Sequence, residues 1–357
     1  MKIRLIGIRN SLGIGVHYTK FADALLKLSH WKNLVEEVYF NDQAAMLAAA
    51  ARSEPDDINI CFVSIPLQNH FRGTNIQWVV FESTLVPPHI MSTMLTADVV
   101  WVPSVWGKGV LMENGLDGIH CDVVPEGVDS GQYHPWRPPY DDGIFRYLLT
   151  GKYEQRKSIT ETIDAWAMAF GNDPTVELSI KTNHFENHEI KKQQIVEHIT
   201  RLDLKNVNVW YGAVPEHELI TLYHRSNVFV LPTKGEGWGL PLIEAAACGL
   251  PIITTMWSGH TEFLNHTANS VVQVGFDMVP IDCPEYTFYY PTDDNNWGEW
   301  AQPRTDHIAY GLIGAREDYQ RLHANALINS DIIRKEFSWE QSVNTAMKML
   351  QQRNLLK

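Results

Sequence analysis

The stretch TKGEGWGLPLIEAAACGLPIITT, Thr233–Thr255, decides the fold class because a glycine loop, a helix and the start of a strand follow one another in it. The apolar run VFVLPT that leads into it predicts a buried strand. Glycines permit a tight loop, Pro241 suits a first helical position and Gly249 suits a helix C-cap. This succession predicts an α/β protein with a parallel, doubly wound sheet.

The same stretch places two carboxylates beside a helix N-terminus. Free backbone N–H groups and the positive end of the helix converge there, so the position suits an anion such as phosphate. Glu236 lies in the glycine loop, and Glu244 lies about one turn into the helix. Because both carboxylates can face one crevice that also holds a phosphate, the pattern indicates a nucleotide ribose and a sugar as ligands.

Glu236 and Glu244 are separated by seven residues. At these positions the chain resembles the retaining GT-B glycosyltransferases of family 4, whose hallmark is the spacing E-x7-E. The resemblance implies two Rossmann-like domains that face each other across a cleft, with a C-terminal helix that crosses back to the N-terminal domain. For the two glutamates alone, the alternative is an ordinary turn of a doubly wound sheet, with Glu236 solvated and Glu244 on an outer helix face.

Length and composition describe a soluble globular protein. The chain has 357 residues, enough for two domains, with 45% hydrophobic and 20% charged residues. A formal charge of −13 argues against a nucleic-acid partner and leaves at most weak peripheral membrane association. Four scattered cysteines indicate free thiols in a reducing compartment. The short first strand and the lack of a long apolar run predict a cytoplasmic protein.

Both halves of the chain alternate short apolar strands with helical patterns. The first half offers six strand candidates: Ile3–Ile8, Glu37–Phe40, Ile58–Ser64, Gln77–Glu82, Val99–Pro103 and Cys121–Val124. The second half offers another six: Phe145–Leu149, Val176–Lys181, Val207–Trp210, Val228–Leu231, Ile252–Thr254 and Val271–Val274. A linker rich in Gly, Pro and Asp separates the sets, at residues 126–143.

The predicted domains are residues 1–135 and residues 136–335, and the resemblance implies that the first holds the acceptor and the second the nucleotide sugar. Residues 336–357 form a terminal helix that packs back on the first domain. Ser338 begins this helix with a capping box, and its apolar stripe consists of Trp339, Val343, Ala346 and Leu350.

The glycines after the first strand do not make a dinucleotide fingerprint. The segment NSLGIGVHY contains Gly13 and Gly15, but Tyr18 stands where the third glycine of G-x-G-x-x-G belongs. A dehydrogenase is therefore disfavoured. The resemblance implies a glycine loop here that approaches the donor, with Gly15 as a binding residue, and a plain βα turn is the alternative.

A basic segment follows the first strand of the second half. Lys152, Arg156 and Lys157 lie just outside the carboxyl end of that strand, the edge where open α/β sheets bind ligands. Cations there would neutralise a leaving diphosphate. The resemblance assigns this role to Lys152 and Lys157, although Lys in place of the commoner Arg at the first position loses bidentate phosphate geometry. A solvated basic loop is the alternative.

The resemblance also implies the remaining donor contacts. Gly212 and Val214, in the loop after the strand Val207–Trp210, are the candidates for holding the nucleotide base. Glu244 would bind the ribose and Glu236 the donor sugar. Backbone N–H groups would hold the sugar hydroxyls and the diphosphate, from Gly237, Trp238, Gly239 and Leu240. A long segment, Asp277–Gln302, is predicted to be a functional loop.

Acceptor-side and metal candidates are weaker. Family 4 members often place a histidine near the fourth strand, where this chain has Glu82; His17 and His89 are further candidates. His184 and His188 have the spacing of two metal ligands, but no third ligand is evident, so a solvated pair is favoured. The resemblance implies no metal and no cofactor.

Together with these features, the resemblance to family 4 implies a retaining, metal-independent hexosyltransferase. Its donor would be a UDP- or GDP-linked sugar, and its acceptor a carbohydrate, a lipid-linked molecule or a small molecule. Front-face transfer and attack by Glu236 both stay open as mechanisms. Two alternatives to a transferase are a hydrolysing nucleotide-sugar epimerase of GT-B fold and a non-catalytic sugar-binding protein.

Overall fold

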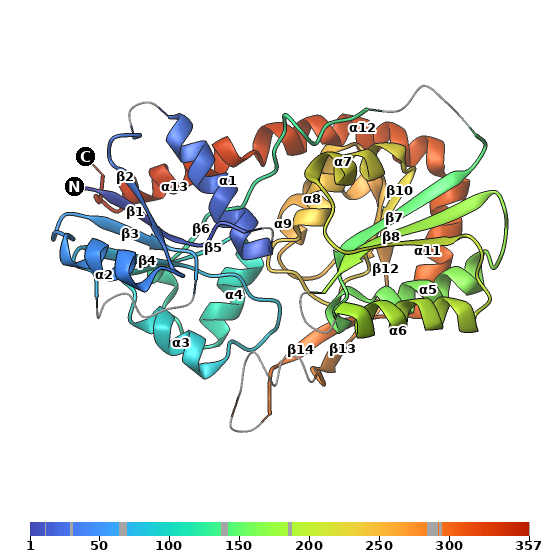
Figure 1. Ribbon diagram of the computed structural model, residues 1–357, viewed down its shortest axis with the longest axis horizontal. Coiled ribbons are helices and arrows are strands. Elements are labelled where there is room, and N and C mark those ends of the chain that lie inside the picture. Colours follow the sequence, from blue (N-terminus) through green and yellow to red (C-terminus); the bar gives the residue numbers. More distant parts are fainter. Residues whose placement is uncertain are drawn as a thin grey trace. The chain divides into compact units, whose positions relative to one another are not determined.

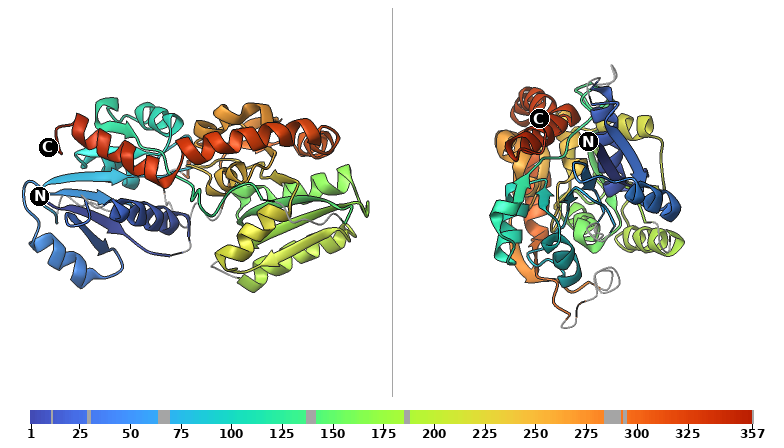
Figure 2. Two further views of the ribbon diagram at one scale, coloured as in Figure 1. Left: turned by 90° about the horizontal axis from the view of Figure 1, so that it is seen from above. Right: turned by 90° about the vertical axis from the view of Figure 1, so that its left-hand side faces the viewer.

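The computed structural model describes residues 1–10, 12–28, 31–63, 70–136, 142–184, 188–283, 292 and 295–356 (Figure 1). The side chains of His89 and His188 lie outside this described part. The chain forms two compact units. Unit 1 consists of Met1–Asp129, Pro284–Gly298 and Glu336–Lys357, and unit 2 consists of Ser130–Cys283 and Glu299–Lys335. In each unit helices cover both faces of a sheet (Figure 2).

Unit 1 contains a six-stranded sheet with the order β2-β1-β3-β4-β5-β6, in which every pairing is parallel. Its strands are β1 (Ile3–Gly7), β2 (Val35–Tyr39), β3 (Ile58–Cys61), β4 (Thr74–Trp78), β5 (Val99–Val102) and β6 (Cys121–Val123). Its helices include α1 (Gly13–Lys27), α2 (Gln43–Ala51), α3 (Pro88–Leu95), α4 (Val105–Glu113) and α13 (Trp339–Gln352). The strands β1, β3 and β5 are fully buried, and most of their residues are apolar, with Arg4 and Asn59 as buried polar exceptions.

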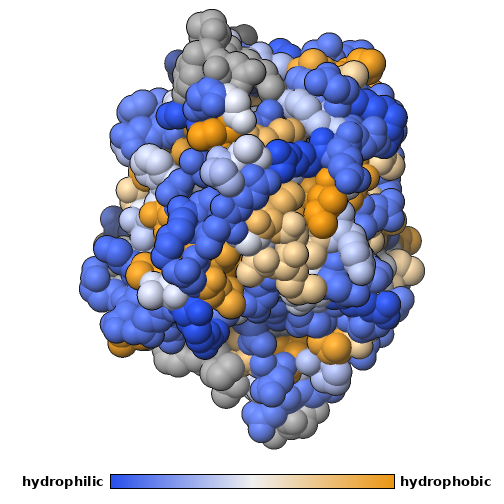
Figure 3. Space-filling model, turned by 90° about the vertical axis from the view of Figure 1, so that its right-hand side faces the viewer, coloured by the Kyte–Doolittle hydropathy of each residue, from blue (hydrophilic) through white to orange (hydrophobic). Residues whose placement is uncertain are grey.

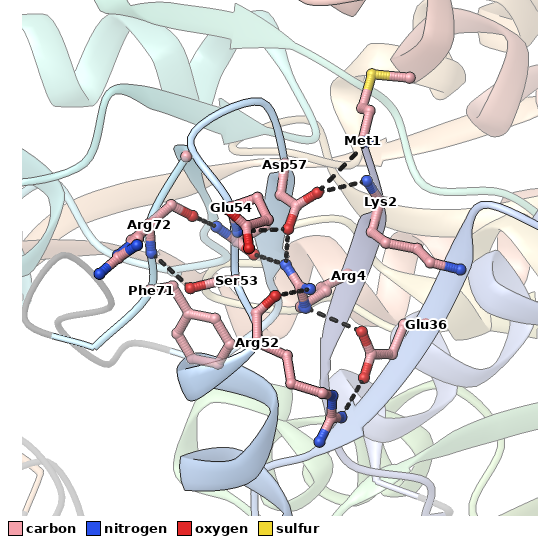
Figure 4. A network of polar contacts seen from close by, with 12 residues as sticks. Met1, Lys2, Arg4, Glu36, Arg52, Ser53, Glu54, Asp57, Phe71 and Arg72 are labelled. Atoms are coloured by element: carbon pink, nitrogen blue, oxygen red, sulfur yellow. Dashed lines mark hydrogen bonds and ion pairs between the residues drawn. The ribbon is translucent and has the colours of Figure 1, made fainter.

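A buried ion pair joins the amino ends of three of these strands (Figure 4). Arg4 of β1 is 2% exposed, and its Nη1 donates to Asp57 Oδ2 at 2.6 Å while its Nε donates to Glu36 Oε2 at 3.0 Å. Burial alone would raise the pKa of Asp57, but backbone N–H donors and Arg4 lower it. Because ligands of open α/β sheets bind at the opposite, carboxyl edge, this network is a structural clamp.

Unit 2 contains a second parallel sheet, of the order β12-β11-β10-β7-β8-β9. Its strands are β7 (Phe145–Lys152), β8 (Val176–Asn183), β9 (Val207–Tyr211), β10 (Val228–Val230), β11 (Ile252–Thr255) and β12 (Val271–Val274). The chain winds outward from β7 to β9, then returns to β10 on the other side of β7. The boundary between β7 and β10 is therefore the topological switch point, and open α/β sheets bind ligands outside the carboxyl ends of the strands at such a point.

Helices cover the two faces of this sheet. They are α5 (Ile159–Ala169), α6 (His188–Arg201), α7 (Glu216–Arg225), α8 (Leu240–Ala247), α9 (Thr261–Leu264), α11 (Thr305–Glu317) and α12 (Tyr319–Glu336). The Tyr147 hydroxyl donates to the carbonyl of Leu312 in α11, whereas the Thr150 hydroxyl contacts Tyr223 in α7. Since alternate residues of a strand point to opposite faces, α11 and α7 lie on opposite faces of the sheet.

The terminal helix belongs to unit 1, where α13 packs against α1. Ser338 caps it as predicted, because its Oγ accepts a hydrogen bond from the backbone N–H of Gln341 at 3.2 Å. The predicted stripe is buried as well, with Trp339 at 5% exposure and Val343 at 0%. The predicted fold class, an α/β protein with two doubly wound, Rossmann-like parallel sheets, is confirmed.

All twelve predicted strands are present, and all but Val271–Val274 have at least one shifted end. One element was not predicted. The ends of the segment expected to be a loop, Asp277–Gln302, contribute to an antiparallel pair of strands, β13 (Phe276–Pro280) and β14 (Glu299–Pro303). Residues 284–291 and 293–294 of that segment lie outside the described residues.

Exposed hydrophobic side chains of unit 2 lie on separate helices. Met168 of α5, Tyr310 of α11 and Ile328 of α12 are each more than half exposed. On the face drawn in Figure 3, apolar patches alternate with hydrophilic residues. Among the described helices, none is both long and apolar enough to cross a membrane.

Candidate active site

The loop between β10 and α8 carries Glu236 and is almost fully buried. It follows the strand on one side of the topological switch point of unit 2, whereas Lys157 follows β7 on the other side. Gly239 ends the loop with φ of +97°, a left-handed conformation that favours glycine, and α8 begins at the next residue. The sheet topology thus brings Lys157 and Glu236, which are 79 positions apart, to the carboxyl edge of the same sheet.

Two cations hold the carboxylate of Glu236. Lys157 Nζ donates to Glu236 Oε1 at 2.6 Å, and Arg156 Nη1 lies 3.1 Å from Glu236 Oε2. The three side chains are nearly buried, with exposed fractions of 6% for Glu236, 8% for Lys157 and 10% for Arg156. Because these three charged groups are withdrawn from water, their attraction is screened far less than that of a surface ion pair.

The backbone around Glu236 is fixed from two sides. Its N–H donates to Ser258 Oγ at 2.8 Å, and its carbonyl accepts from the N–H of Gly259, also at 2.8 Å. Arg156 Nη1 donates to the carbonyl of Gly235 at 2.6 Å, and the carbonyl of Arg156 accepts from Lys234 N at 2.7 Å. The carboxylate and its cations are therefore held in place before any ligand arrives.

The neighbouring charges determine the protonation states of Glu236 and Lys157. Burial alone would raise the pKa of Glu236, but the charges of Lys157 and Arg156 lower it to about 2. Glu236 is therefore an anion at neutral pH and has no proton to donate as a general acid. Burial lowers the pKa of Lys157, and the charge of Glu236 opposes that shift.

The cluster carries more positive than negative charge. Lys152 Nζ and Arg156 Nη2 both contact Glu154, at 3.4 and 3.2 Å. With Lys157 and Glu236, the group consists of three cations and two carboxylates. The surplus cation suits a diphosphate at this edge.

We expect Gly259→Ala to destabilise this loop. A Cβ at position 259 would lie 1.9 Å from the carbonyl oxygen of Gly237, closer than atoms can approach without a backbone shift. The shift would disturb the hydrogen bond from Gly259 N to the Glu236 carbonyl. Chemical denaturation should show a loss of about 2 kcal/mol or more in the free energy of unfolding. The control is Gly109→Ala, a helical position in unit 1 where a Cβ meets nothing within 4 Å. Equal stability of the two variants would contradict the close approach.

Glu244 lies in α8 and is half-buried. Its Oε2 accepts a hydrogen bond from the Tyr223 hydroxyl at 2.8 Å, and the same hydroxyl lies 3.1 Å from Thr150 Oγ1. Tyr223 is fully buried, so a rigid chain of polar groups from β7 and α7 orients the carboxylate. This arrangement is compatible with a carboxylate that binds hydroxyl groups.

The remaining donor candidates of unit 2 take different positions. Gly212 follows β9 with φ of +109°, and its N–H donates to the carbonyl of Thr182. Val214 is half-buried just before α7. Trp238 is 2% exposed and packs against the ring of Phe263, so its indole is part of the core and its backbone alone is left to meet a ligand. Gly237 is buried within the loop, and Leu240, half-buried, follows its buried part.

The remaining candidates, Gly15, His17 and Glu82, belong to unit 1, whereas the Glu236 cluster belongs to unit 2. Gly15 lies inside the first turn of α1, where a Cβ would meet Asn10 Oδ1 at 1.9 Å. His17 is 2% exposed and its ring is edge-on to Phe62 and Trp78. Burial lowers its pKa to about 3, so the imidazole is neutral. Glu82 is half-buried in the loop after β4. Its assignment to an acceptor stays a prediction.

The β13–β14 ribbon is attached to the Glu236 loop. Ala301 N in β14 donates to the carbonyl of Lys234 at 3.0 Å. Lys234 Nζ pairs with Glu161 at 2.9 Å, and Gln302 Nε2 donates to the same carboxylate at 3.2 Å. The ribbon therefore holds the loop in place through Lys234 and Glu161.

No group of three or more His, Cys, Asp or Glu side chains that could hold a metal ion occurs among the residues that the structure describes. The four cysteines are buried and free.

The part of the chain that contains the Glu236 cluster resembles known glycosyltransferases. Residues 140–277 match the family model of Glycosyl transferases group 1. Mannosylfructose-phosphate synthase of Agrobacterium fabrum is 24% identical over 180 residues, 47% of this chain and 40% of that protein. O-antigen chain mannosyltransferase B of Escherichia coli is 43% identical over 145 residues, 40% of this chain and 30% of that protein. The alignments thus span less than half of these relatives, and they support a relationship to group 1 glycosyltransferases.

Solved structures match over the full length. Anabaena Alr3699/HepE in complex with UDP and glucose has a TM-score of 0.73 at 14% identity, covering 99% of this chain and 100% of that chain. Sucrose-phosphate synthase from Thermosynechococcus elongatus has a TM-score of 0.74 at 16% identity, covering 99% of both chains. At this identity the likeness establishes the fold, which is that of the GT-B glycosyltransferases.

Proposed function

We propose that this protein is a retaining glycosyltransferase that moves a hexose from a UDP- or GDP-linked donor to a hydroxyl acceptor. The observation that carries the proposal is the buried contact of Glu236 with Lys157 and Arg156 at the switch point of the second sheet. Its support from comparison is the match of residues 140–277 to group 1 glycosyltransferases.

In this proposal each part of the site meets one part of the donor. Lys157 and Lys152, with Arg156, hold the diphosphate, and the segment Gly237–Leu240 before and at the start of α8 adds backbone N–H groups. Glu244 binds the ribose hydroxyls, and Glu236 binds the sugar. Gly212 and Val214 are near the base. The solved complex of Anabaena Alr3699/HepE with UDP and glucose is compatible with such a ligand.

The reaction breaks the bond between sugar C1 and the diphosphate oxygen and forms a bond between C1 and the acceptor oxygen. The acceptor proton passes to the departing diphosphate, so the products are a glycoside and a nucleoside diphosphate. Negative charge grows on the diphosphate as the bond breaks, and fixed cations stabilise that charge most. Lys157 and Arg156 each contact one oxygen of the Glu236 carboxylate, which disfavours a role as nucleophile and favours front-face transfer.

The test is a donor screen followed by a transfer assay. A saturating donor should raise Tm by several degrees, because ligand at 100 times Kd adds about 2.7 kcal/mol of stability. Acceptors are then added with EDTA present, and NMR of the product reads the anomeric configuration. Retention with EDTA-resistant turnover is the expected result. Free nucleotide without transfer would indicate a hydrolysing enzyme instead, and binding without turnover a sugar-binding protein.

A further inference from the structure

Lys181 is a nearly buried lysine with no partner in the described structure. It lies in β8, two residues before the strand ends, and is 9% exposed. Within the described ranges, no hydrogen bond or ion pair joins its ammonium group to another residue. The buried lysines of the same unit differ in this respect, since Lys157 contacts Glu236 and Lys234 contacts Glu161.

The strand register fixes the face from which Lys181 projects. Its partners across the neighbouring strands are Thr150 of β7 and Trp210 of β9. Registered neighbours in a parallel sheet point to the same face. Thr150 contacts Tyr223, which in turn donates to Glu244. Lys181 therefore projects from the face that carries the proposed ribose-binding carboxylate.

The order of the strands gives its place along the crevice edge. From β10 through β7 and β8 to β9, the edge presents the Glu236 loop, Lys157, the end of β8 and then Gly212. The proposed diphosphate contacts lie at β10 and β7, and the proposed base contacts lie after β9. Lys181 thus lies between them, on the side of the nucleoside.

An ammonium group withdrawn from water loses solvation, and no described residue replaces that solvation at Lys181. Burial accordingly lowers the pKa of Lys181. Lys has three N–H donors and no acceptor, so its missing partner is an acceptor oxygen or nitrogen. A half-exposed Trp210 on the neighbouring strand offers a flat apolar surface beside it.

Resting on the proposed function, we propose that Lys181 donates a hydrogen bond to O4 of uracil or O6 of guanine in the donor and so selects these bases. Cytosine and adenine present an amino group at the corresponding position. Two donors cannot pair there, so the amino bases would leave the ammonium without its bond.

Calorimetric titration with matched nucleotide pairs tests the inference. Wild type should bind UDP about tenfold more tightly than CDP, or GDP about tenfold more tightly than ADP, which corresponds to about 1.4 kcal/mol. Lys181→Met should reduce that preference to less than about threefold by weakening the keto-base nucleotide. Lys181→Gln should also remove it, because an amide can turn either its donor or its acceptor toward the base. The control is Lys192→Met, an exposed position on α6.

Stability separates a ligand-binding lysine from a structural one. Tm of Lys181→Met without nucleotide should equal or exceed that of wild type, because the unpartnered buried charge is removed. Unchanged affinities in both Lys181 variants would overturn the inference, as would an equal loss for all four nucleotides, which would indicate general attraction of phosphate. If wild type binds none of the four, the proposed function falls together with this inference. Binding by wild type with no effect of the variants removes this inference alone.

Discussion

Glu236→Gln should lower kcat by about 10²–10³-fold while leaving the affinity for nucleoside diphosphate intact or stronger. The carboxylate lies against Lys157 at 2.6 Å and Arg156 at 3.1 Å in a buried site. The amide removes one negative charge, so two buried cations are left with insufficient compensation. A bound diphosphate supplies the missing negative charge, whereas the sugar that is transferred loses its proposed contact with Glu236.

The same substitution should change stability in a nucleotide-dependent way. Without ligand, the free energy of unfolding should fall by about 3 kcal/mol, the usual consequence of breaking a buried pair. With saturating UDP or GDP, most of that loss should be recovered, so the ligand-induced rise in Tm should exceed that of wild type. Steady-state kinetics and thermal denaturation measure both effects. The matched control is Glu154→Gln, which removes a carboxylate beside Arg156 at 21% side-chain exposure and should have smaller effects.

Two outcomes would contradict this account. Turnover near the wild-type value would remove Glu236 from the reacting centre and leave it a structural anion. A parallel loss of kcat and of nucleotide affinity, with no recovery of stability, would show that the substitution distorts the loop.

The pH dependence of stability follows from the same contact. Because the folded pKa of Glu236 is lowered below the unfolded value, its ionised form stabilises the folded state above the unfolded pKa of about 4.3. This contribution is lost as pH falls through that value toward about 2.

The strands were predictable because their signal is local. Buried parallel strands such as Val99–Val102 and Val228–Val230 have continuous apolar sequences. The glycine, proline and capping residues around α8 and α13 are also local signals. The ribbon β13–β14 was missed because its segment is rich in polar residues and proline, and its partner for hydrogen bonding, Lys234, lies far away in the sequence.

The candidate site was predictable in its residue types but not in its contacts. The spacing of Glu236 and Glu244 and the basic segment after β7 indicated a nucleotide-sugar site. Arg156 was seen as part of that segment, yet its contact with the Gly235 carbonyl joins residues 79 positions apart. Only the strand order β10-β7 brings these loops together, and no local pattern encodes that order. Tyr223 was missed for the same reason, since a buried tyrosine resembles any core residue.

Lys157→Met should reduce kcat/KM for the donor by about 10²–10³-fold, a loss of about 2.7–4 kcal/mol of transition-state stabilisation. Lys157 is the described cation closest to Glu236 and lies at the switch point, where negative charge grows on the diphosphate in the proposed reaction. Methionine keeps the length of the apolar stem, which passes close to Gly151, and removes only the charge. Arg156 remains to pair with Glu236, so the fold should survive.

The pH profile distinguishes a charge that acts on the substrate from one that acts on the fold. Burial lowers the pKa of Lys157 below the ordinary lysine value, so wild-type kcat/KM should fall on the basic side at a pH below that value. Lys157→Met should lack this basic limb, whereas Lys205→Met, at an exposed lysine, should keep it with wild-type rates. Wild-type-like kinetics of Lys157→Met would count against the diphosphate assignment. If Lys157→Met lowers kcat/KM but keeps the basic limb, the titrating group is another residue, because methionine cannot titrate.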